Sequence, residues 1–223
     1  MRVISPGYTI LDKLDATEIL KKIEAAGRIC YKSEDKTSEG SHEKFIRAIV
    51  RRGHESVIEH ANISVLFVCD RGVTHQIVRH RIASYSMEST RYCNYAHDKF
   101  GSEVTFIRPF YWDTDSRLYK LWEEQMRQAE QTYLKMIELG ATPEEARGVL
   151  PHSLKSELVV TMNLRQWRHF FKQRIAKDAL PQIREIAIPL LIELRELLPV
   201  VFGDITVDDE EKWQKLAAGW SKA

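Results

Sequence analysis

The hydrophobic pattern is strongest between residues 114 and 139, where apolar side chains recur every three or four positions. The members of this stripe are Leu118, Leu121, Trp122, Met126, Ala129, Tyr133, Met136 and Ile137. This spacing predicts one long helix whose stripe lies in the core rather than in a cofactor site, and Gly140 is expected to end it. The segment Thr142-Pro143-Glu144-Glu145 combines a capping side chain, an early proline and an acid at the third position, so a second helix is expected there.

Weaker patterns predict the remaining elements. Helices are expected at about 15–31, 41–52, 72–81, 164–176 and 182–198. Strands are expected at about 61–69, 104–107 and 156–162, after an extended lead-in over residues 1–14. The first helix is expected to begin at Asp15, with Glu18 at the capping-box position. Residues 84–94 are polar and show no clear period.

The order of these elements indicates a fold class. Strands and helices do not alternate strictly, so the pattern favours an α+β fold, an antiparallel sheet with flanking helices, over a doubly wound fold. No repeat, low-complexity tract or Gly/Ser linker divides the chain. Residues 1–223 are therefore expected to form a single compact domain.

Composition narrows the class of protein. The chain has 223 residues, of which 43% are hydrophobic and 29% charged, as is ordinary for a soluble globular protein. A formal net charge of +1 argues against a protein built mainly to coat nucleic acid, which needs a basic excess. Any anion site must therefore come from local clustering of arginine.

Cysteine usage and apolar runs indicate the compartment. The three cysteines, Cys30, Cys69 and Cys93, form no CxxC pair, which is typical of a reducing compartment and gives no disulfide or metal framework. No apolar h-region follows the first residues, and no apolar run approaches the ~20 residues that span a bilayer. We therefore expect a cytoplasmic protein without a membrane partner.

Several common site motifs are missing. None of the ten glycines forms a Gly-x-Gly, so the Rossmann dinucleotide fingerprint is excluded, and there is no GK[ST] phosphate loop. His54 and His60 are six residues apart, which on a helix places them on different faces, unlike the pair in HExxH. No metal site is therefore expected.

Residues 79–92 concentrate groups that bind anions. This segment contains three arginines, one histidine, three serines and two tyrosines. Guanidinium groups are fixed positive forks suited to phosphate or carbonyl oxygens. Gln76 lies three residues before Arg79, so on a helix both would face the same way. The segment is typical of a nucleotide-phosphate site, while the alternative is a solvated basic turn with Arg79 and Arg81 paired to acids elsewhere.

The same segment carries a signature. Arg79-His80-Arg81, seven further residues and then Ser89 match the RHR-x7-S signature of the flavin-dependent thymidylate synthases, and the continuation Thr90-Arg91-Tyr92 also resembles that family. The chain is similar to the family in further segments, at residues 52–55, 59–60, 145–151 and 163–174. The resemblance implies one flavin-dependent thymidylate synthase-like domain over residues 1–223.

The resemblance implies a role for each matching residue. The FAD contacts are expected from Ser56, Arg79, His80, Arg81, Met87, Asn163, Arg165 and His169. The dUMP contacts are expected from Gln76, Arg79, Ser89, Thr90, Arg91, Arg147 and Arg174. His54 is expected on the folate side, and Arg174 is expected to be catalytic, because it would meet the charge that develops on uracil.

The resemblance also implies the reaction and the assembly. The expected reaction is methylation of dUMP to dTMP, with 5,10-methylenetetrahydrofolate as carbon donor and FADH2, reduced by NADPH, as hydride donor. The family is a homotetramer with sites between subunits, and the expected partners are these small molecules, not nucleic acid. Ser89 is expected to be a hydrogen-bond donor rather than a nucleophile, because no histidine–acid pair is evident to activate it.

Two departures from the family leave alternatives open. Ser86-Met87 stands where the family often has Asn-Glu, so a carboxylate role does not transfer to Met87, and the neighbouring Glu88 leaves that question open. His169 stands where the family sometimes has an amide. A degenerate homologue that binds nucleotide and flavin without turnover is therefore one alternative.

The other alternative is a nucleic-acid-binding module that uses a basic helix. Its contact residues would be Arg165, Trp167, Arg168, His169, Lys172 and Arg174. A helix with one core face and one solvated face explains the same pattern. The members of that core face would be Leu164, Trp167, Phe170 and Phe171.

Overall fold

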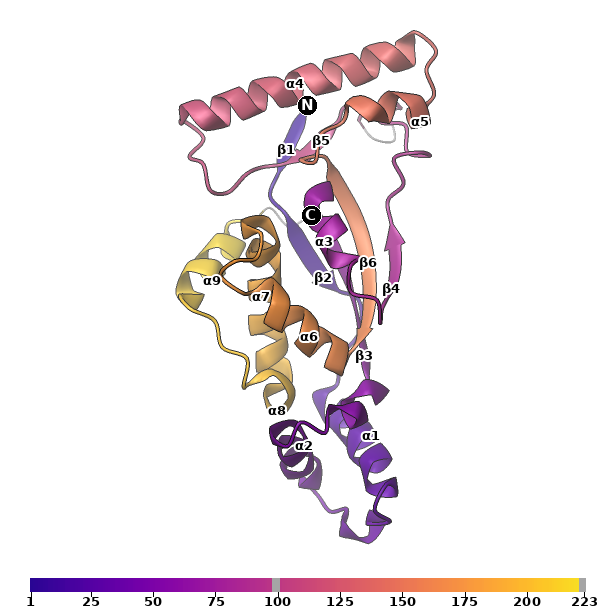
Figure 1. Ribbon diagram of the computed structural model, residues 1–223, viewed down its shortest axis with the longest axis vertical. Coiled ribbons are helices and arrows are strands. Elements are labelled where there is room, and N and C mark those ends of the chain that lie inside the picture. Colours follow the sequence, from indigo (N-terminus) through magenta and orange to yellow (C-terminus); the bar gives the residue numbers. More distant parts are fainter. Residues whose placement is uncertain (98–100, 221–223) are drawn as a thin grey trace.

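The computed structural model describes residues 1–97 and 101–220. Its centre is an antiparallel sheet of four strands in the order β2-β3-β6-β4 (Figure 1). These strands are β2 (Gly7–Ile10), β3 (Asn62–Asp70), β6 (Lys155–Asn163) and β4 (Ser84–Met87). A separate parallel pair joins β1 (Arg2–Ile4) to β5 (Thr105–Ile107). The predicted α+β class with an antiparallel sheet is confirmed.

Helices surround this sheet. They are α1 (Ala16–Ile29), α2 (Ser41–Arg51), α3 (Arg71–Ile77), α4 (Arg117–Glu138), α5 (Pro143–Ala146), α6 (Leu164–Arg174), α7 (Pro181–Leu197), α8 (Pro199–Phe202) and α9 (Glu210–Ala218), with short 3-10 turns η1 (Glu34–Lys36), η2 (Glu55–His60) and η4 (Arg147–Val149). Asp15 caps α1 by accepting from the Glu18 backbone N–H, and Thr142 forms a reciprocal capping box with Glu145 at α5. The caps at Asp15 and Thr142 are therefore confirmed. At α1 the Glu18 side chain accepts from Lys21 instead of forming the reciprocal bond of a capping box.

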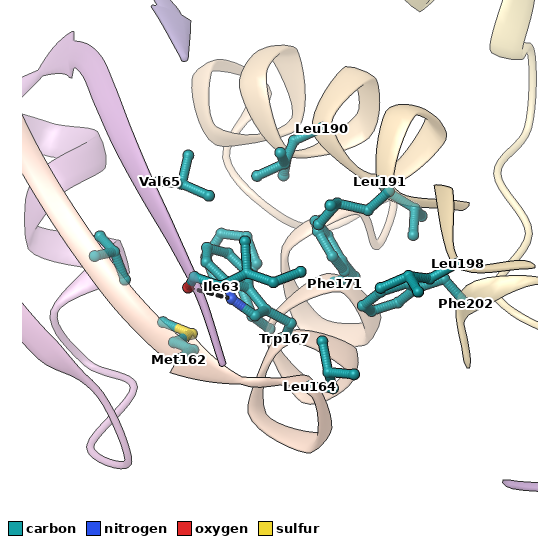
Figure 2. Packing of buried hydrophobic residues seen from close by; sticks show 14 of the residues in the cluster. Ile63, Val65, Met162, Leu164, Trp167, Phe171, Leu190, Leu191, Leu198 and Phe202 are labelled. Atoms are coloured by element: carbon teal, nitrogen blue, oxygen red, sulfur yellow. Dashed lines mark hydrogen bonds between the residues drawn. The ribbon is translucent and has the colours of Figure 1, made fainter. Parts of the chain in front are cut away.

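The main core lies between β3, β6 and the helices α6 and α7 (Figure 2). Ile63 and Val65 of β3 and Met162 of β6 point into it, which is the alternation that a strand with one buried face requires. Trp167 of α6 is fully buried there and donates its indole N–H to the Ile63 carbonyl oxygen at 3.0 Å. Helix α6 is thereby fixed against the sheet, and the side chains on its other face have defined positions.

A second cluster lies beneath α4. Met126, Ala129 and Tyr133 of α4 are buried, as predicted for the stripe. Leu118 and Leu121 are instead 56% and 53% exposed, so their assignment to the core is wrong. These residues occupy the first turns of a long helix that extends past the β1–β5 pair on which it rests (Figure 1). The helix also begins at Arg117 rather than near residue 114, because the Ser116 hydroxyl caps the Tyr119 N–H at 3.2 Å.

Helix α3 is shorter than the predicted helix at 72–81. It ends at Ile77, and the Tyr85 hydroxyl lies against the backbone carbonyl oxygens of Ile77, at 3.0 Å, and of His80. This side chain satisfies carbonyl groups at the helix end, so the chain turns instead of continuing. The interpretation that Gln76 and Arg79 share a helical face is therefore wrong, because Arg79 lies beyond the helix.

Strand β4 was not predicted. The polar stretch at 84–94 begins with residues 84–87, which form an edge strand paired with Leu158–Thr161 of β6. Ser84 and Ser86 are exposed, while Tyr85 packs against the main core. Residues 84–87 alternate polar and apolar side chains, but over four residues only, which is too short a run to stand out from the polar segment around it. The strand also depends on pairing with β6, more than seventy residues later in the chain.

Candidate functional site

His80 lies at the centre of the candidate site. It follows the end of α3, and its side chain is buried, with 4% of the residue exposed. The ring packs edge-on against Phe170 and His169 of α6, with centroids 5.1 and 5.6 Å away. Burial first, and then the nearby Arg174 and His169, together lower the pKa of His80 to about 4. The imidazole is therefore neutral at neutral pH.

Arg174, the last residue of α6, is held by hydrogen bonds to two residues. Its Nε donates to Nε2 of His80 at 3.0 Å. Its Nη1 donates to Oε1 of Gln76 at 3.0 Å, and its Nη2 donates to the Gln76 carbonyl oxygen at 3.1 Å. Burial and the charge of Arg79 lower the pKa of Arg174, although a guanidinium keeps its proton at neutral pH. The structure thus brings together three predicted site residues, Gln76, His80 and Arg174.

Arg79 and Arg81 flank His80 and point to solvent. Both are exposed, and within residues 1–97 and 101–220 neither side chain forms an ion pair or a hydrogen bond. The alternative in which these two arginines are paired to acids elsewhere finds no partner in that part of the chain. Two cations without a counter-ion beside a neutral histidine are suited to an anionic ligand.

A cleft of about 430 Å³ opens beside α6. Its walls are Glu55, Glu59, Ile82, Asn163, Arg165, Gln166, His169 and Lys172. Three of them, Asn163, Arg165 and His169, are predicted FAD contacts. Asn163 accepts the Gln166 backbone N–H at 2.8 Å as the cap of α6, and Arg165 forms an exposed ion pair with Glu59 at 2.6 Å. The cleft has the polar, mixed-charge lining that a large cofactor with phosphate and hydroxyl groups needs.

The turn η2 carries the remaining predicted residues of this side. His54 and Ser56 are exposed at its start. The turn packs on α6 through Arg168, which donates from Nε to Glu55 Oε1 at 2.9 Å and from Nη2 to Asp204 Oδ2 at 2.8 Å. Sequence reasoning missed this contact, and nothing in the spacing of the three residues indicates it.

The burial of α6 bears on the nucleic-acid hypothesis. Trp167 is fully buried, and Arg168 is 1% exposed and engaged by two carboxylates. Trp167 and Arg168, two of the contact residues of that hypothesis, are therefore not accessible to a nucleic acid. The pattern is explained by one core face and one solvated face.

A second group of predicted residues lies at the other end of β4. Arg147 Nη1 donates to Thr90 Oγ1 at 3.3 Å, and Arg91 forms an exposed ion pair with Glu144 at 2.8 Å. Ser89 Oγ accepts the Arg91 backbone N–H at 3.3 Å. Strand β4 runs between this group and the His80 group, and pairs from Ser84↔Thr161 to Met87↔Leu158. At ~3.3 Å per residue the strand alone separates their ends by about 10 Å, and no hydrogen bond or ion pair among the described residues joins the two groups.

Met87 and Glu88 lie between the groups. Met87 is 40% exposed. Glu88 accepts hydrogen bonds from the Tyr95 hydroxyl at 2.8 Å and the Lys155 ammonium at 2.9 Å. Its carboxylate is therefore engaged within the fold and does not replace a carboxylate at position 87.

A metal site and a membrane-spanning helix each place requirements on the described residues. In the described ranges, no group of three His, Cys, Asp or Glu side chains is placed to hold a metal ion. In the same ranges, no helix combines the length and apolar character needed to cross a membrane.

Comparison with known proteins defines the family. Residues 12–200 match the family described as thymidylate synthase complementing protein. The flavin-dependent thymidylate synthase of Pyrococcus furiosus is 37% identical over 188 residues, which cover 82% of this chain and 72% of that protein. The Geobacter sulfurreducens protein of the same name is 33% identical over 186 residues, which cover 80% and 78%. The chain therefore belongs to the flavin-dependent thymidylate synthase family, and the predicted family and enzyme class are confirmed.

A solved structure supports the same fold. It is described as a UMP/dUMP methylase PolB from Streptomyces cacaoi bound with 5-Br dUMP. It superposes with a TM-score of 0.73 over 91% of this chain and 96% of that chain, at 24% sequence identity. At that identity the likeness establishes a shared fold.

Proposed function

We propose that this protein methylates dUMP to dTMP, with 5,10-methylenetetrahydrofolate as carbon donor and NADPH as reductant of the flavin. The names of the curated relatives support the reaction class. The observation that carries the proposal is the fixed fork of Arg174 beside two exposed arginines. Residues 1–223 act in this proposal as one domain of a cytoplasmic enzyme without nucleic-acid or membrane partners.

Arg174 is the proposed catalytic residue. A guanidinium has five N–H donors, and three are occupied by His80 and Gln76. One donor therefore remains on each Nη atom, and such a donor is proposed to meet a uracil carbonyl oxygen. Negative charge grows on that oxygen while C5 of uracil attacks the carbon donor. A cation held in advance stabilises such charge without reorganisation during the reaction.

The dUMP phosphate requires further cations. Arg79 and Arg81 are exposed and uncompensated within the described residues. A second group at the far end of β4 combines two cations with two hydroxyl groups. Its members are Arg91, Arg147, Ser89 and Thr90. The Arg91–Glu144 pair is exposed, so exchanging Glu144 for a phosphate costs little.

The separation of the two groups supports a homotetramer with sites at subunit interfaces. One subunit supplies Gln76, His80 and Arg174, and another supplies the group around Ser89. A closed symmetric assembly repeats this junction at every site. The outer edge of β4 and the exposed Met87 then lie next to the neighbouring subunit's contribution.

The cleft beside α6 is the proposed FAD site. Its cations, Arg165 and Lys172, could bind a diphosphate by exchanging their carboxylate partners, Glu59 and Glu55, and the amide of Asn163 is fixed at its wall. When bound and reduced by NADPH, the flavin would supply the hydride that completes the methyl group. The other FAD contacts are proposed for Ser56, Arg79, His80, Arg81, Met87 and His169. His54, exposed at the start of η2, is proposed for the folate side.

The test is a reconstitution with purified protein and FAD. We expect flavin absorption bands that NADPH bleaches, and dTMP only when dUMP, methylenetetrahydrofolate and NADPH are all present. A protein that stays colourless after FAD addition and makes no dTMP would contradict the proposal. A yellow protein that binds dUMP without producing dTMP would instead establish the degenerate homologue.

A further inference from the structure

We propose that Gln166 is a positioning residue that fixes the tautomer of His80 and, through it, the guanidinium of Arg174. The amide nitrogen Nε2 of Gln166 lies 3.2 Å from Nδ1 of His80, and the Arg174 Nε lies 3.0 Å from Nε2 of His80 on the other side of the ring. The inference deepens the proposed function, and only its effect on turnover rests on that function.

The tautomer follows from the donors and acceptors. A guanidinium Nε–H can only donate, so Nε2 of His80 must accept. A neutral imidazole then carries its single proton on Nδ1. The Nδ1–H needs an acceptor, so the Gln166 amide must be reversed to present Oε1 in place of Nε2 to the ring. The hydrogen-bond network decides which end of an amide is the oxygen. With the proton on Nε2, two donors would face each other and Arg174 would lose this contact.

The surroundings keep the ring uncharged. Arg174 and His169, both from α6, are the titratable groups that face His80, and with burial they hold its pKa at about 4. Phe170 packs on the ring and Tyr85 contacts the backbone carbonyl, while the charged side chains of Arg79 and Arg81, the neighbours in sequence, are exposed. A protonated ring would donate from Nε2, so the acceptor for Arg174 exists only while His80 is neutral.

Gln166 is itself held firmly. It is 8% exposed, and its backbone N–H is bound by the Asn163 side chain at 2.8 Å. The next residue, Trp167, anchors the same turn of α6 in the core. The amide therefore has a fixed position, and a chain of hydrogen bonds runs from Gln166 through His80 and Arg174 to Gln76. A fixed outer partner of this kind orients a functional histidine, as carboxylates and carbonyls do for histidine metal ligands.

Two substitutions separate positioning from stability. Gln166→Leu removes the acceptor, and we expect kcat to fall about 10- to 100-fold at saturating FAD, the usual effect of losing an outer hydrogen-bond partner. Because Gln166 also lines the cleft beside α6, flavin occupancy is read from the visible spectrum and kcat is expressed per bound flavin. Gln166→Glu keeps an acceptor for Nδ1–H, but its carboxylate raises the pKa of His80. Its activity should therefore be lost at low pH and recover as the pH rises, so that the acid limb of the kcat profile moves upward. Gln173→Leu, an exposed glutamine of the same helix, is the matched control and should retain wild-type kcat.

Neutron crystallography of the tetramer tests the tautomer without any turnover. We expect deuterium on Nδ1 of His80 and the Gln166 oxygen facing it. Deuterium on Nε2 would overturn the inference, as would an unchanged kcat and pH profile in both Gln166 variants of an active enzyme. Deuterium on Nδ1 in a protein that makes no dTMP would support the tautomer while refuting the proposed function.

Discussion

The guanidinium of Arg174 binds two oxygen atoms of a single residue, Gln76: the side-chain Oε1 at 3.0 Å and the backbone carbonyl oxygen at 3.1 Å. This paired contact joins the end of α6 to α3, 98 residues earlier in the chain. With His80 bound at Nε, three donors of the fork are occupied within the fold. The guanidinium is thereby held in position before any substrate arrives.

The first prediction concerns this fork. Arg174→Ala should lower kcat by about 10²-fold or more even at saturating dUMP, because the group is proposed to stabilise charge in the transition state. FAD should remain bound, since the proposed flavin cleft does not include Arg174. Arg174→Lys should rescue poorly, because a point charge cannot bind His80 and Gln76 together. Steady-state kinetics with FAD occupancy from the visible spectrum measure both effects, and a raised KM with near-normal kcat would make Arg174 a binding residue only.

The second prediction tests the division of each site between subunits. Co-assembled Arg174→Ala and Arg147→Ala subunits should regain activity that neither variant has alone, because some sites then combine two intact halves. In a random mixture about one quarter of the sites should be intact. The control is Arg174→Ala with Arg79→Ala, two changes on the same side, which should leave the mixture inactive. Equal activity in both mixtures would contradict the interface site.

The third prediction concerns Ser89. Its hydroxyl accepts the Arg91 backbone N–H, and no histidine–acid pair is placed beside it among the hydrogen bonds of the described residues. Ser89→Ala should therefore leave measurable dTMP formation, with a loss in dUMP affinity of about 0.5–1.5 kcal/mol for one hydrogen bond. A covalent Ser89–nucleotide species found by mass spectrometry, with an inactive alanine variant, would show that Ser89 is a nucleophile.

Much of the fold is encoded in local signals that can be read from the sequence. The capping residues Asp15 and Thr142 marked their helices correctly because each cap acts within three or four residues. The end of α3 and strand β4 were missed because they depend on Tyr85 reaching back to α3 and on pairing with distant β6. Leu118 and Leu121 satisfy the helical period, but the period alone does not show whether the rest of the protein extends far enough along α4 to cover them.

The site shows the same limit. The arginines and His80 were found because they form one contiguous motif with a known family pattern. Gln166 was not singled out, since its role depends on a histidine 86 residues away. The partners of the Arg168–Glu55 ion pair are 113 residues apart, and the spacing of residues in the sequence does not indicate this contact either. Short-range motifs can therefore be read directly, whereas the contacts that orient them need the folded chain.

The fourth prediction tests the packing of α6 on the main core. Trp167→Ala should lower the free energy of unfolding by about 3–5 kcal/mol, because it opens a cavity in the core and leaves the Ile63 carbonyl oxygen without its donor. Leu139→Ala, at a residue 76% exposed, should change it by less than about 0.5 kcal/mol. Urea denaturation at one fixed protein concentration gives both values. Similar small changes in both variants would mean that the main core is placed wrongly.

The fifth prediction concerns Glu185, which is 1% exposed and whose pKa burial raises from 4.5 to about 8. The folded state keeps this carboxyl protonated while the unfolded chain ionises it. Its contribution to the free energy of unfolding is therefore complete below pH 4.5 and is lost as the pH rises to about 8. Glu185→Gln should make stability less dependent on pH in this window, and the exposed Glu124→Gln should not. If the free energy of unfolding changes equally with pH in Glu185→Gln and the wild type, the raised pKa of Glu185 would be contradicted.

The most direct test of the account follows the transferred carbon. The purified protein with FAD is incubated with dUMP, NADPH and methylenetetrahydrofolate labelled with ¹³C at the methylene carbon, and the nucleotide product is analysed by mass spectrometry. The account predicts dTMP with the label in its methyl group, and no product when NADPH or the folate is omitted. Unlabelled dTMP, or the absence of dTMP from a protein that has bound both FAD and dUMP, would contradict it.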